Sequence, residues 1–321
     1  MNLRIVIGVV LVAMASLAVP ATGRETGRPI RLLVGFPAGS AADSAGRTLA
    51  ESLRDSLGQS VVVDNRPGAG GRIAAELLQQ SPADGSTLLL APMGTMIFFP
   101  VVVAKLAYDP WKDFVHISQV ATLRLGFAVA PSMPAKSLRE YLTWAKANPG
   151  KASYGSAGAG TPPHFLGLML GKAAGIELSH VAYKGGPPLV TDMLGGHIHA
   201  GMGTFVDFSD LHRAGKLRIL AIGGATRPAG LPDVPTFREQ GYDLDGMTWL
   251  GVHAPGGMKQ ATVDRFAATI AAATRKPDVQ ERFQKLGFEL TGTSAEGFVR
   301  IMKHDREKWE PVIRTSGFKA E

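Results

Sequence analysis

Two loops built mainly of glycine and alanine are the places in this sequence best suited to hold a small anion. The first loop, residues 36–43, reads FPAGSAAD, and the second, residues 155–164, reads GSAGAGTPPH. Small side chains let backbone amides approach a ligand, and each loop opens a segment with helical periodicity. Because the start of a helix is electropositive, these loops favour a carboxylate or a phosphate. The alternative is that both are ordinary tight turns.

A third glycine-rich loop and one acidic residue have structural explanations that compete with a binding role. Residues 65–72 read NRPGAGGR, in which Asn65 and Arg66 could fix a turn against a sheet. Asp43 stands where the first helix is expected to begin, so it complements the helix dipole and can pair with Arg47. We favour the structural interpretation for the third loop and for this pairing.

Signatures of cofactor binding are incomplete. Residues 68–73 read GAGGRI and lack the last glycine of a dinucleotide fingerprint. Gly171-Lys172 has Leu166 at the position where a phosphate-binding P-loop requires glycine. The sequence therefore predicts no nucleotide cofactor.

Signatures of catalysis and metal binding are equally incomplete. Ser156 is followed by Gly158 but has Tyr154, not glycine, two residues before it, so it does not complete a nucleophile elbow. His197 and His199 could face one metal ion from a strand, but no third ligand follows at a recognisable spacing. The prediction is that the chain has no catalytic residues, no metal and no cofactor, and is not an enzyme.

Composition narrows the class of partner. The 321 residues include no cysteine, which excludes disulfides, thiolate metal sites and cysteine nucleophiles. The formal net charge of +7 helps to attract anions. No dense basic run is interleaved with aromatic residues, so we predict no nucleic-acid partner.

The first 23 residues have the pattern of a secretory signal peptide. Arg4 precedes an apolar run from Ile5 to Val19, and small residues follow at Ala21 and Gly23. The run is shorter than the roughly 20 residues that a membrane-spanning helix needs. We expect residues 1–23 to be cleaved and the mature chain to be free and soluble outside the cytoplasm.

Short apolar runs alternate with amphipathic segments, as expected for strands joined by helices. The expected strands are residues 30–36, 61–64, 87–91, 152–154, 179–183, 216–222 and 247–254. Expected helices lie between them, for example 72–80 and 138–147, and two more follow the last strand. Three successive strand–helix units predict a parallel, doubly wound sheet.

The length of the chain predicts two lobes, because about 300 residues exceed what one hydrophobic core usually spans. The strand–helix pattern starts again in the middle of the chain. This predicts one lobe from residues 28–125 plus 250–321 and another from residues 126–249. The chain would cross near residues 121–128 and 246–252, and such a paired crossing is typical of a hinge.

Eight motifs, in order along the chain, resemble those of the Bug receptors, the extracytoplasmic solute-binding proteins of tripartite tricarboxylate transporters. They are FPAGSAAD at 36, VVVDNRPGAGG at 61, PADGSTLLLAP at 82, YDPWKDF at 108, AKANPGKASYGSAGAGT at 145, HVAYKGGPPLVTDMLGG at 180, AGKLRILAIGGATRPAGLPDVPTFREQGY at 214 and KWEPVI at 308. The resemblance runs from Ile30 to about Phe318. It implies an α/β, two-lobed periplasmic binding protein fold (type II-like), each lobe a doubly wound sheet flanked by helices and joined to the other by two crossings.

The same resemblance implies that a monomeric receptor captures a small organic carboxylate in the cleft and delivers it to membrane permease subunits. The ligand-binding residues it implies are Phe36, Pro37, Ala38, Gly39, Ser40 and Asp43 on the first loop, Ser156, Ala157, Gly158, Gly160, Thr161 and His164 on the second, and Tyr183, Lys184 and Gly203 at the border. Lys184 is the cation of this set, and it fits a solvated rim position as well as a salt bridge to the ligand.

Three positions depart from the family pattern. Ser40 replaces a glycine, and Leu168 replaces a glutamate whose role we do not assign. Residues 202–204 read MGT where relatives often have Phe-Asp-Asn, so Gly203 takes the place of an acid that could meet a ligand's amine. This loss favours a plain organic or aromatic carboxylate over an amino acid.

Two other functions fit the same residues. A sensory adaptor would bind the same ligand but dock on the ectodomain of a membrane receptor kinase. A periplasmic hydrolase or isomerase would need a general base, which the sequence does not reveal.

Overall fold

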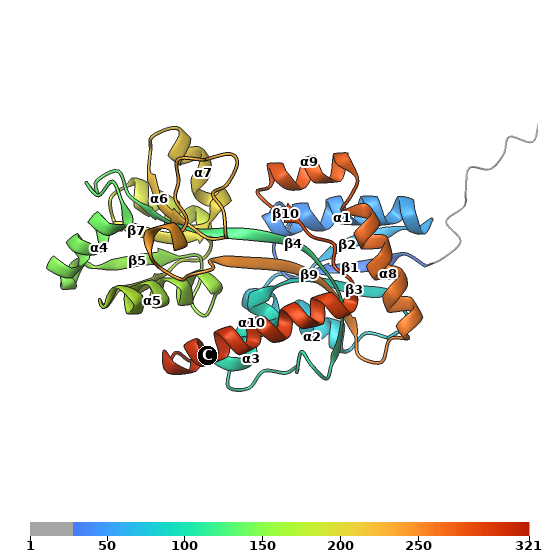
Figure 1. Cartoon of the computed structure of the whole chain (residues 1–321). Helices are drawn as coiled ribbons and strands as arrows, with labels where there is room; N and C mark the ends of the chain where they lie inside the picture. Colours follow the sequence, from blue (N-terminus) through green and yellow to red (C-terminus); the bar gives the residue numbers. More distant parts are fainter. Residues whose placement is uncertain (1–27, 321) are drawn as a thin grey trace, which may run out of the picture.

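The computed structural model describes residues 28–320, so the expected signal peptide, residues 1–23, lies outside the described residues. Figure 1 shows two α/β halves joined by two long strands, β4 and β9. Within residues 28–320, none of the helices has the length and apolar character needed to cross a membrane.

The first half is built on a mixed sheet. β1 (Ile30–Val34), β2 (Val61–Asn65) and β3 (Thr87–Pro92) are parallel, in the order β2-β1-β3. β9 (Met247–Pro255) pairs antiparallel with β3, and β4 (Phe114–Val129) pairs antiparallel with β9, with the short β10 (Glu289–Leu290) beside it. The expected parallel arrangement holds for the first three strands. The added strands are antiparallel because they are the segments that leave and re-enter this half.

Helices cover both faces of this sheet, as expected for a doubly wound fold. Along β1, Leu32 belongs to one core with helices α1 (Ala41–Leu57), α8 (Gln260–Ala273) and α9 (Pro277–Lys285). The neighbouring Leu33 belongs to the opposite core. The elements of that face are α2 (Arg72–Gln79), the π-helical turn η2 (Gly94–Phe98), α3 (Phe99–Val102) and α10 (Ala295–Thr315), with the short turn η1 (Ala69–Gly71) before α2.

The second half repeats this plan on a smaller scale. β7 (Ala200–Thr204), β5 (Ser153–Ser156) and β6 (Ser179–Ala182) are parallel and adjacent in that order, and β8 (Arg218–Ile222) pairs with β4. The helices are α4 (Leu138–Ala147), α5 (Pro162–Ala174), α6 (Gly186–Leu194) and α7 (Phe205–Arg213), and the short turns are η3 (Pro149–Lys151) and η4 (Arg238–Gln240). β7 was missing from the expected strands because two of its five residues are glycine, which lowers strand propensity.

The two sheets exchange partners inside one continuous strand. Residues 114–124 of β4 pair with β9, and residues 125–129 pair with β7 and β8. The returning chain meets this point directly, because the amide of Leu125 donates to the carbonyl of Gly246 at 2.7 Å, one residue before β9 begins. The change of partner falls inside the expected crossing at residues 121–128.

Candidate functional site

The first glycine-rich loop joins β1 to the start of α1. Ser40 caps the helix, since its Oγ accepts a hydrogen bond from the amide of Asp43 at 3.2 Å. Gly39 has φ +81, which favours glycine, and a β-carbon there would have no neighbour within 4 Å. Residues 37–39 are exposed to solvent. The loop therefore presents its backbone to open space.

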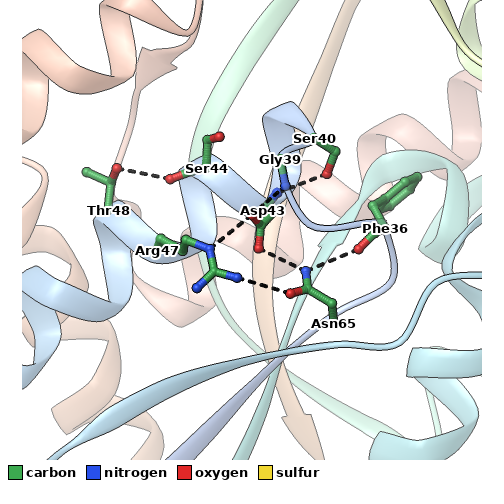
Figure 2. A network of polar contacts seen from close by, with 8 residues as sticks. All are labelled: Phe36, Gly39, Ser40, Asp43, Ser44, Arg47, Thr48 and Asn65. Carbon is green, nitrogen blue, oxygen red and sulfur yellow. Dashed lines mark hydrogen bonds and ion pairs between the residues drawn. The ribbon is translucent and has the colours of Figure 1, made fainter.

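The buried carboxylate of Asp43 is hydrogen-bonded to this loop, as Figure 2 shows. Its Oδ2 accepts hydrogen bonds from the amide of Gly39 at 2.8 Å and from Nε of Arg47 at 3.0 Å, and its Oδ1 accepts from Nδ2 of Asn65 at 2.9 Å. Burial alone would raise the pKa of Asp43, but these hydrogen bonds hold it below its usual value. The predicted pairing with Arg47 is confirmed, and both carboxylate oxygens have protein partners.

Asn65 links the first loop to the third. Its Nδ2 also donates to the carbonyl of Phe36 at 3.1 Å, and its Oδ1 accepts from Arg47 at 3.2 Å. Arg66 forms an ion pair with Asp64 at 2.9 Å. Asn65 fixes the turn against the sheet through its side chain, and Arg66 does so through its amide, which donates to the carbonyl of Val34 at 2.8 Å.

The second glycine-rich loop joins β5 to α5 and turns its hydroxyls inward. Ser156 is 0 % exposed, and its Oγ donates to the carbonyl of Gly158 at 3.0 Å. Thr161 Oγ1 donates to the same carbonyl at 2.6 Å. Pro162 and Pro163, at the start of α5, carry no amide hydrogen. An anion at this helix start must therefore be bound by the amides of the loop itself, which was not foreseen from the sequence.

Two stacked histidines lie beneath the second loop. The rings of His164 and His180 are 3.9 Å apart at their centroids, and Nδ1 of His164 accepts a hydrogen bond from the amide of Gly160 at 3.1 Å. Burial lowers the pKa of His164 to about 4 and, with a contribution from His164, that of His180 to about 3. Both rings are therefore neutral at neutral pH, and His164, expected as a ligand contact, has its ring packed into the interior.

The pair Ser156 and His180 resembles a nucleophile and its base, since Oγ and Nε2 lie 2.7 Å apart. The Oγ of Ser156 also lies 3.0 Å from the carbonyl of Gly158, and which group donates to which in the Ser156–His180 pair depends on the tautomer of His180. Ser156 is fully buried, so this hydroxyl does not face solvent. The pair fixes the loop.

The remaining expected residues have separate surroundings. Tyr183 is half-buried and donates its hydroxyl to Oδ2 of Asp192 at 2.9 Å, and burial, followed by this contact, raises the pKa of Tyr183 to about 12. Lys184 is exposed. Gly203 is buried in β7, and a β-carbon there would lie 2.8 Å from the ring of Phe208. Packing accounts for glycine at position 203.

Sequence reasoning missed an acid beside Gly203. Asp207 lies one turn into α7, where its Oδ2 accepts hydrogen bonds from the amide and the hydroxyl of Thr204 at 2.9 and 2.7 Å. This carboxylate lies 3.3 Å from the position of a Gly203 β-carbon, and burial raises its pKa. The T-x-x-D spacing of a capping box was the signal that could have located it. Among residues 28–320, no group of three or more acidic or histidine side chains is arranged to hold a metal ion.

A β-carbon on Gly94 would lie 3.6 Å from Cδ of Pro162, within the second loop. The next residue, Thr95, donates its hydroxyl to the carbonyl of Gly70 at 3.1 Å. Gly71 in turn lies against the ring of Phe36, 3.6 Å from the position of its β-carbon. The second loop thus contacts η2 directly, and the first loop is linked to η2 through Gly70 and Gly71 of the third loop.

Comparisons with known proteins agree over almost the whole chain. The model of the tripartite tricarboxylate transporter family receptor matches residues 45–318. A protein encoded in the tcbD-tcbE intergenic region of Pseudomonas sp. (strain P51) is 34% identical over 293 residues, covering 89% of this chain and 85% of that protein. Protein BugT of Bordetella pertussis is 32% identical over 320 residues, covering 98% and 97%.

Solved structures are similar to the same extent. The structure of R. palustris Rpa4515 with adipate has a TM-score of 0.83 at 29% identity, covering 92% of this chain and 99% of that chain. MatC from Rhodopseudomonas palustris with bound malate has a TM-score of 0.78 at 25% identity, covering 89% and 98%. The expected α/β periplasmic binding protein fold is confirmed.

Proposed function

Because the chain belongs to the tripartite tricarboxylate transporter receptor family, we propose that it binds a small organic carboxylate between its two halves and delivers it to membrane permease subunits. The family is one of transport receptors, so the chain is a solute-binding protein and not an enzyme. This sets aside the hydrolase or isomerase that the sequence left open.

The convergence of the two glycine-rich loops on η2 carries this proposal. The loops come from opposite halves; Gly94 contacts Pro162 of the second, and Thr95 is linked to Phe36 of the first through Gly70 and Gly71. Each loop follows the carboxyl end of a parallel strand, β1 or β5, which is the usual place for a ligand in such sheets. A molecule between the halves could therefore meet backbone from both.

Backbone amides are the proposed donors. Ala41 and Ala42 occupy the first two positions of α1, where a helix has no internal partner for its N–H groups. The charge of Asp43 does not oppose an anion there, because Arg47 neutralises it at 3.0 Å. In the second loop, Ala157 and Gly158 are partly exposed and extend from the carboxyl end of β5, with the amide of Gly158 3.4 Å from Oγ of Ser156. Charge-assisted hydrogen bonds from such amides are shorter and stronger than neutral ones.

The proposed ligand is an aliphatic dicarboxylate. Two related structures hold adipate and malate, which are both dicarboxylates. A molecule with an anionic group at each end matches a site with one amide-bearing loop in each half. Binding would shift an equilibrium between open and closed arrangements of the halves.

The proposal includes the place and the partners of the protein. We propose that residues 1–23 direct export and that the mature chain acts in the periplasm as a monomer. The lobes would comprise residues 28–125 with 250–321, and residues 126–249. The exchange of partners along β4 between residues 124 and 125 supports this division.

A thermal-shift screen followed by calorimetry tests this function. Adipate, malate, citrate, benzoate and glutamate are added separately to the mature chain. A ligand bound only by the folded state raises the melting temperature, by an amount that grows with its concentration. We expect at least one dicarboxylate to do so, and the absence of any shift with all five acids would overturn the proposal. Co-purification with a permease, and not with a receptor kinase, separates transport from the sensory alternative.

A further inference from the structure

The segment that follows α10 packs against both halves. The body of α10 belongs to the first half, where the ring of Trp309 lies 5.1 Å from that of Phe98. After Gly317, which has φ +68, the chain returns to α3, and the amide of Ala320 donates to the carbonyl of Val102 at 2.9 Å. Figure 1 shows α10 passing below β9 toward α5, with the C-terminus at its end.

Phe318 lies between these attachments and contacts the second half. Its ring meets that of His164 edge to face, with centroids 4.8 Å apart at 79°, and lies 6.0 Å from that of Phe165. It also covers Gly160, because a β-carbon there would lie 3.2 Å from Cε1 of Phe318. A residue near the end of the chain therefore packs directly under the second glycine-rich loop.

The contact continues through a stack of rings to the loop. Phe318 meets His164, His164 stacks on His180 at 3.9 Å, and His180 holds Ser156 at 2.7 Å. His164 also binds the amide of Gly160, whose φ is +73. The two histidines thus hold both Ser156 and Gly160. These two contacts set the orientation of the backbone amides of residues 157–159, which lie between them.

We propose that Phe318 is a positioning residue for ligand binding, which ties the Ser156–Thr161 loop to the first half through the C-terminal segment. The inference rests on the proposed function, because it assumes that this loop binds the ligand. Phe318 itself touches no ligand. It sets the orientation of the loop amides by pressing His164 against His180 and by covering Gly160.

Four variants test this inference. Phe318→Ala removes the ring, and Phe318→Tyr retains a ring at this half-buried position. Lys319→Ala changes the exposed neighbouring residue. Leu57→Ala removes a half-buried apolar side chain of similar exposure at the far end of α1.

The first measurement needs no ligand. Hydrogen exchange of the Gly160 amide and the ring resonances of His164 and His180 are recorded by NMR for each variant. We expect Phe318→Ala to accelerate exchange at Gly160 roughly tenfold, since an aromatic contact contributes about that factor, and to shift both histidine signals as the ring current is lost. Phe318→Tyr should restore both observables, and the two control variants should leave them unchanged.

The second measurement is calorimetry with adipate and malate. We expect Phe318→Ala to weaken the binding of whichever acid the wild-type chain binds by roughly tenfold, with a melting temperature close to that of Leu57→Ala. Unchanged exchange at Gly160 in Phe318→Ala, or a loss that Phe318→Tyr does not restore, overturns the inference. If the wild-type chain binds neither acid, the proposed dicarboxylate fails while the exchange data still decide whether Phe318 positions the loop.

Discussion

The imidazoles of His116 and His253 meet across the two strands that join the halves, with their Nδ1 atoms 2.8 Å apart. The two residues are direct partners in the β4–β9 pairing and are 5 % and 0 % exposed. Neither Nε2 atom has a hydrogen-bond partner among the described residues. Burial lowers the pKa of His116 to about 4, and burial followed by the effect of His116 holds that of His253 well below its usual value. Both rings are therefore neutral in the folded protein at neutral pH.

We expect the free energy of unfolding to decrease as the pH falls from about 6.5 toward about 4. Within this window the unfolded chain protonates these histidines and the folded chain does not. Acid therefore favours the unfolded state, by up to ~1.4 kcal/mol per pH unit for each histidine. Urea unfolding at several pH values across the window measures the slope.

The variant His116→Asn supplies the control, because it keeps a polar group near the Nδ1 position and removes one titrating ring. The slope of its unfolding free energy against pH should be shallower than that of the wild type, by the amount that corresponds to about one bound proton. Buried Asp207 and Asp305 act in the opposite direction, since burial raises the pKa of each. They are present in both proteins, so the difference between the slopes of the wild type and the variant reports on His116. Equal slopes would show that His116 does not titrate between the folded and unfolded states as argued.

Arg124 connects the halves at the point where β4 changes sheets. Its Nε lies 2.5 Å from Oε1 of Glu289 in the first half, and its Nη1 donates to the carbonyls of Gly223, at 3.1 Å, and Thr226 in the second. The guanidinium is mostly buried, whereas Glu289 is half exposed.

We expect Arg124→Ala to destabilise the protein by about 2 to 3 kcal/mol, because two carbonyl oxygens lose a charged donor. Glu289→Ala should cost less than about 1 kcal/mol, since an exposed ion pair contributes little. Urea unfolding of both single variants and of the double variant separates the two contributions. A larger cost for Glu289→Ala than for Arg124→Ala would contradict this account.

The sequence predicted those features that depend on local spacing. The first three parallel strands follow from short apolar runs between helical segments, and the Asp43–Arg47 pair follows from its i, i+4 spacing on α1. The role of Asn65 was predicted from its place at the start of a turn, and its side chain, at the end of β2, does hold the carbonyl of Phe36. The contacts of Asp43 and Asn65 join the first glycine-rich loop to elements that are close to it in the chain or in the sheet.

The sequence could not reveal contacts that only the three-dimensional packing creates. His164, His180 and Phe318 meet although they lie on α5, on β6 and after α10, and no motif links them. Gly203 lacks a side chain because Phe208 fills the adjacent space. Asp207 places a carboxylate beside Gly203. This part of the second half therefore contains an acid although position 203 does not.

The variant Ser156→Ala tests whether this hydroxyl acts on the ligand or on the loop. Because Ser156 is fully buried, we expect its loss to leave Nε2 of His180 without its hydrogen-bond partner and to cost about 1 to 3 kcal/mol of stability. Ligand affinity should fall together with exchange protection at Gly160. The double variant Ser156→Ala, His180→Phe removes the imidazole as well and should recover part of the stability. A loss of affinity with unchanged stability would instead indicate a direct contact between Ser156 and the ligand.

Gly39 offers the sharpest test of the first loop, because the chain contains a matched control. Gly39 and Gly257 have φ values of +81 and +83, both are exposed, and a β-carbon on either would have no neighbour within 4 Å. Valine at either position should cost about 1 to 2 kcal/mol of stability through backbone strain alone. Only Gly39→Val moves the amide that Asp43 holds at 2.8 Å, so only this variant should weaken carboxylate binding in calorimetry, by roughly tenfold or more for a loss of about 1.4 kcal/mol. Equal affinities of Gly39→Val and Gly257→Val for the ligand would remove the first loop from the binding site.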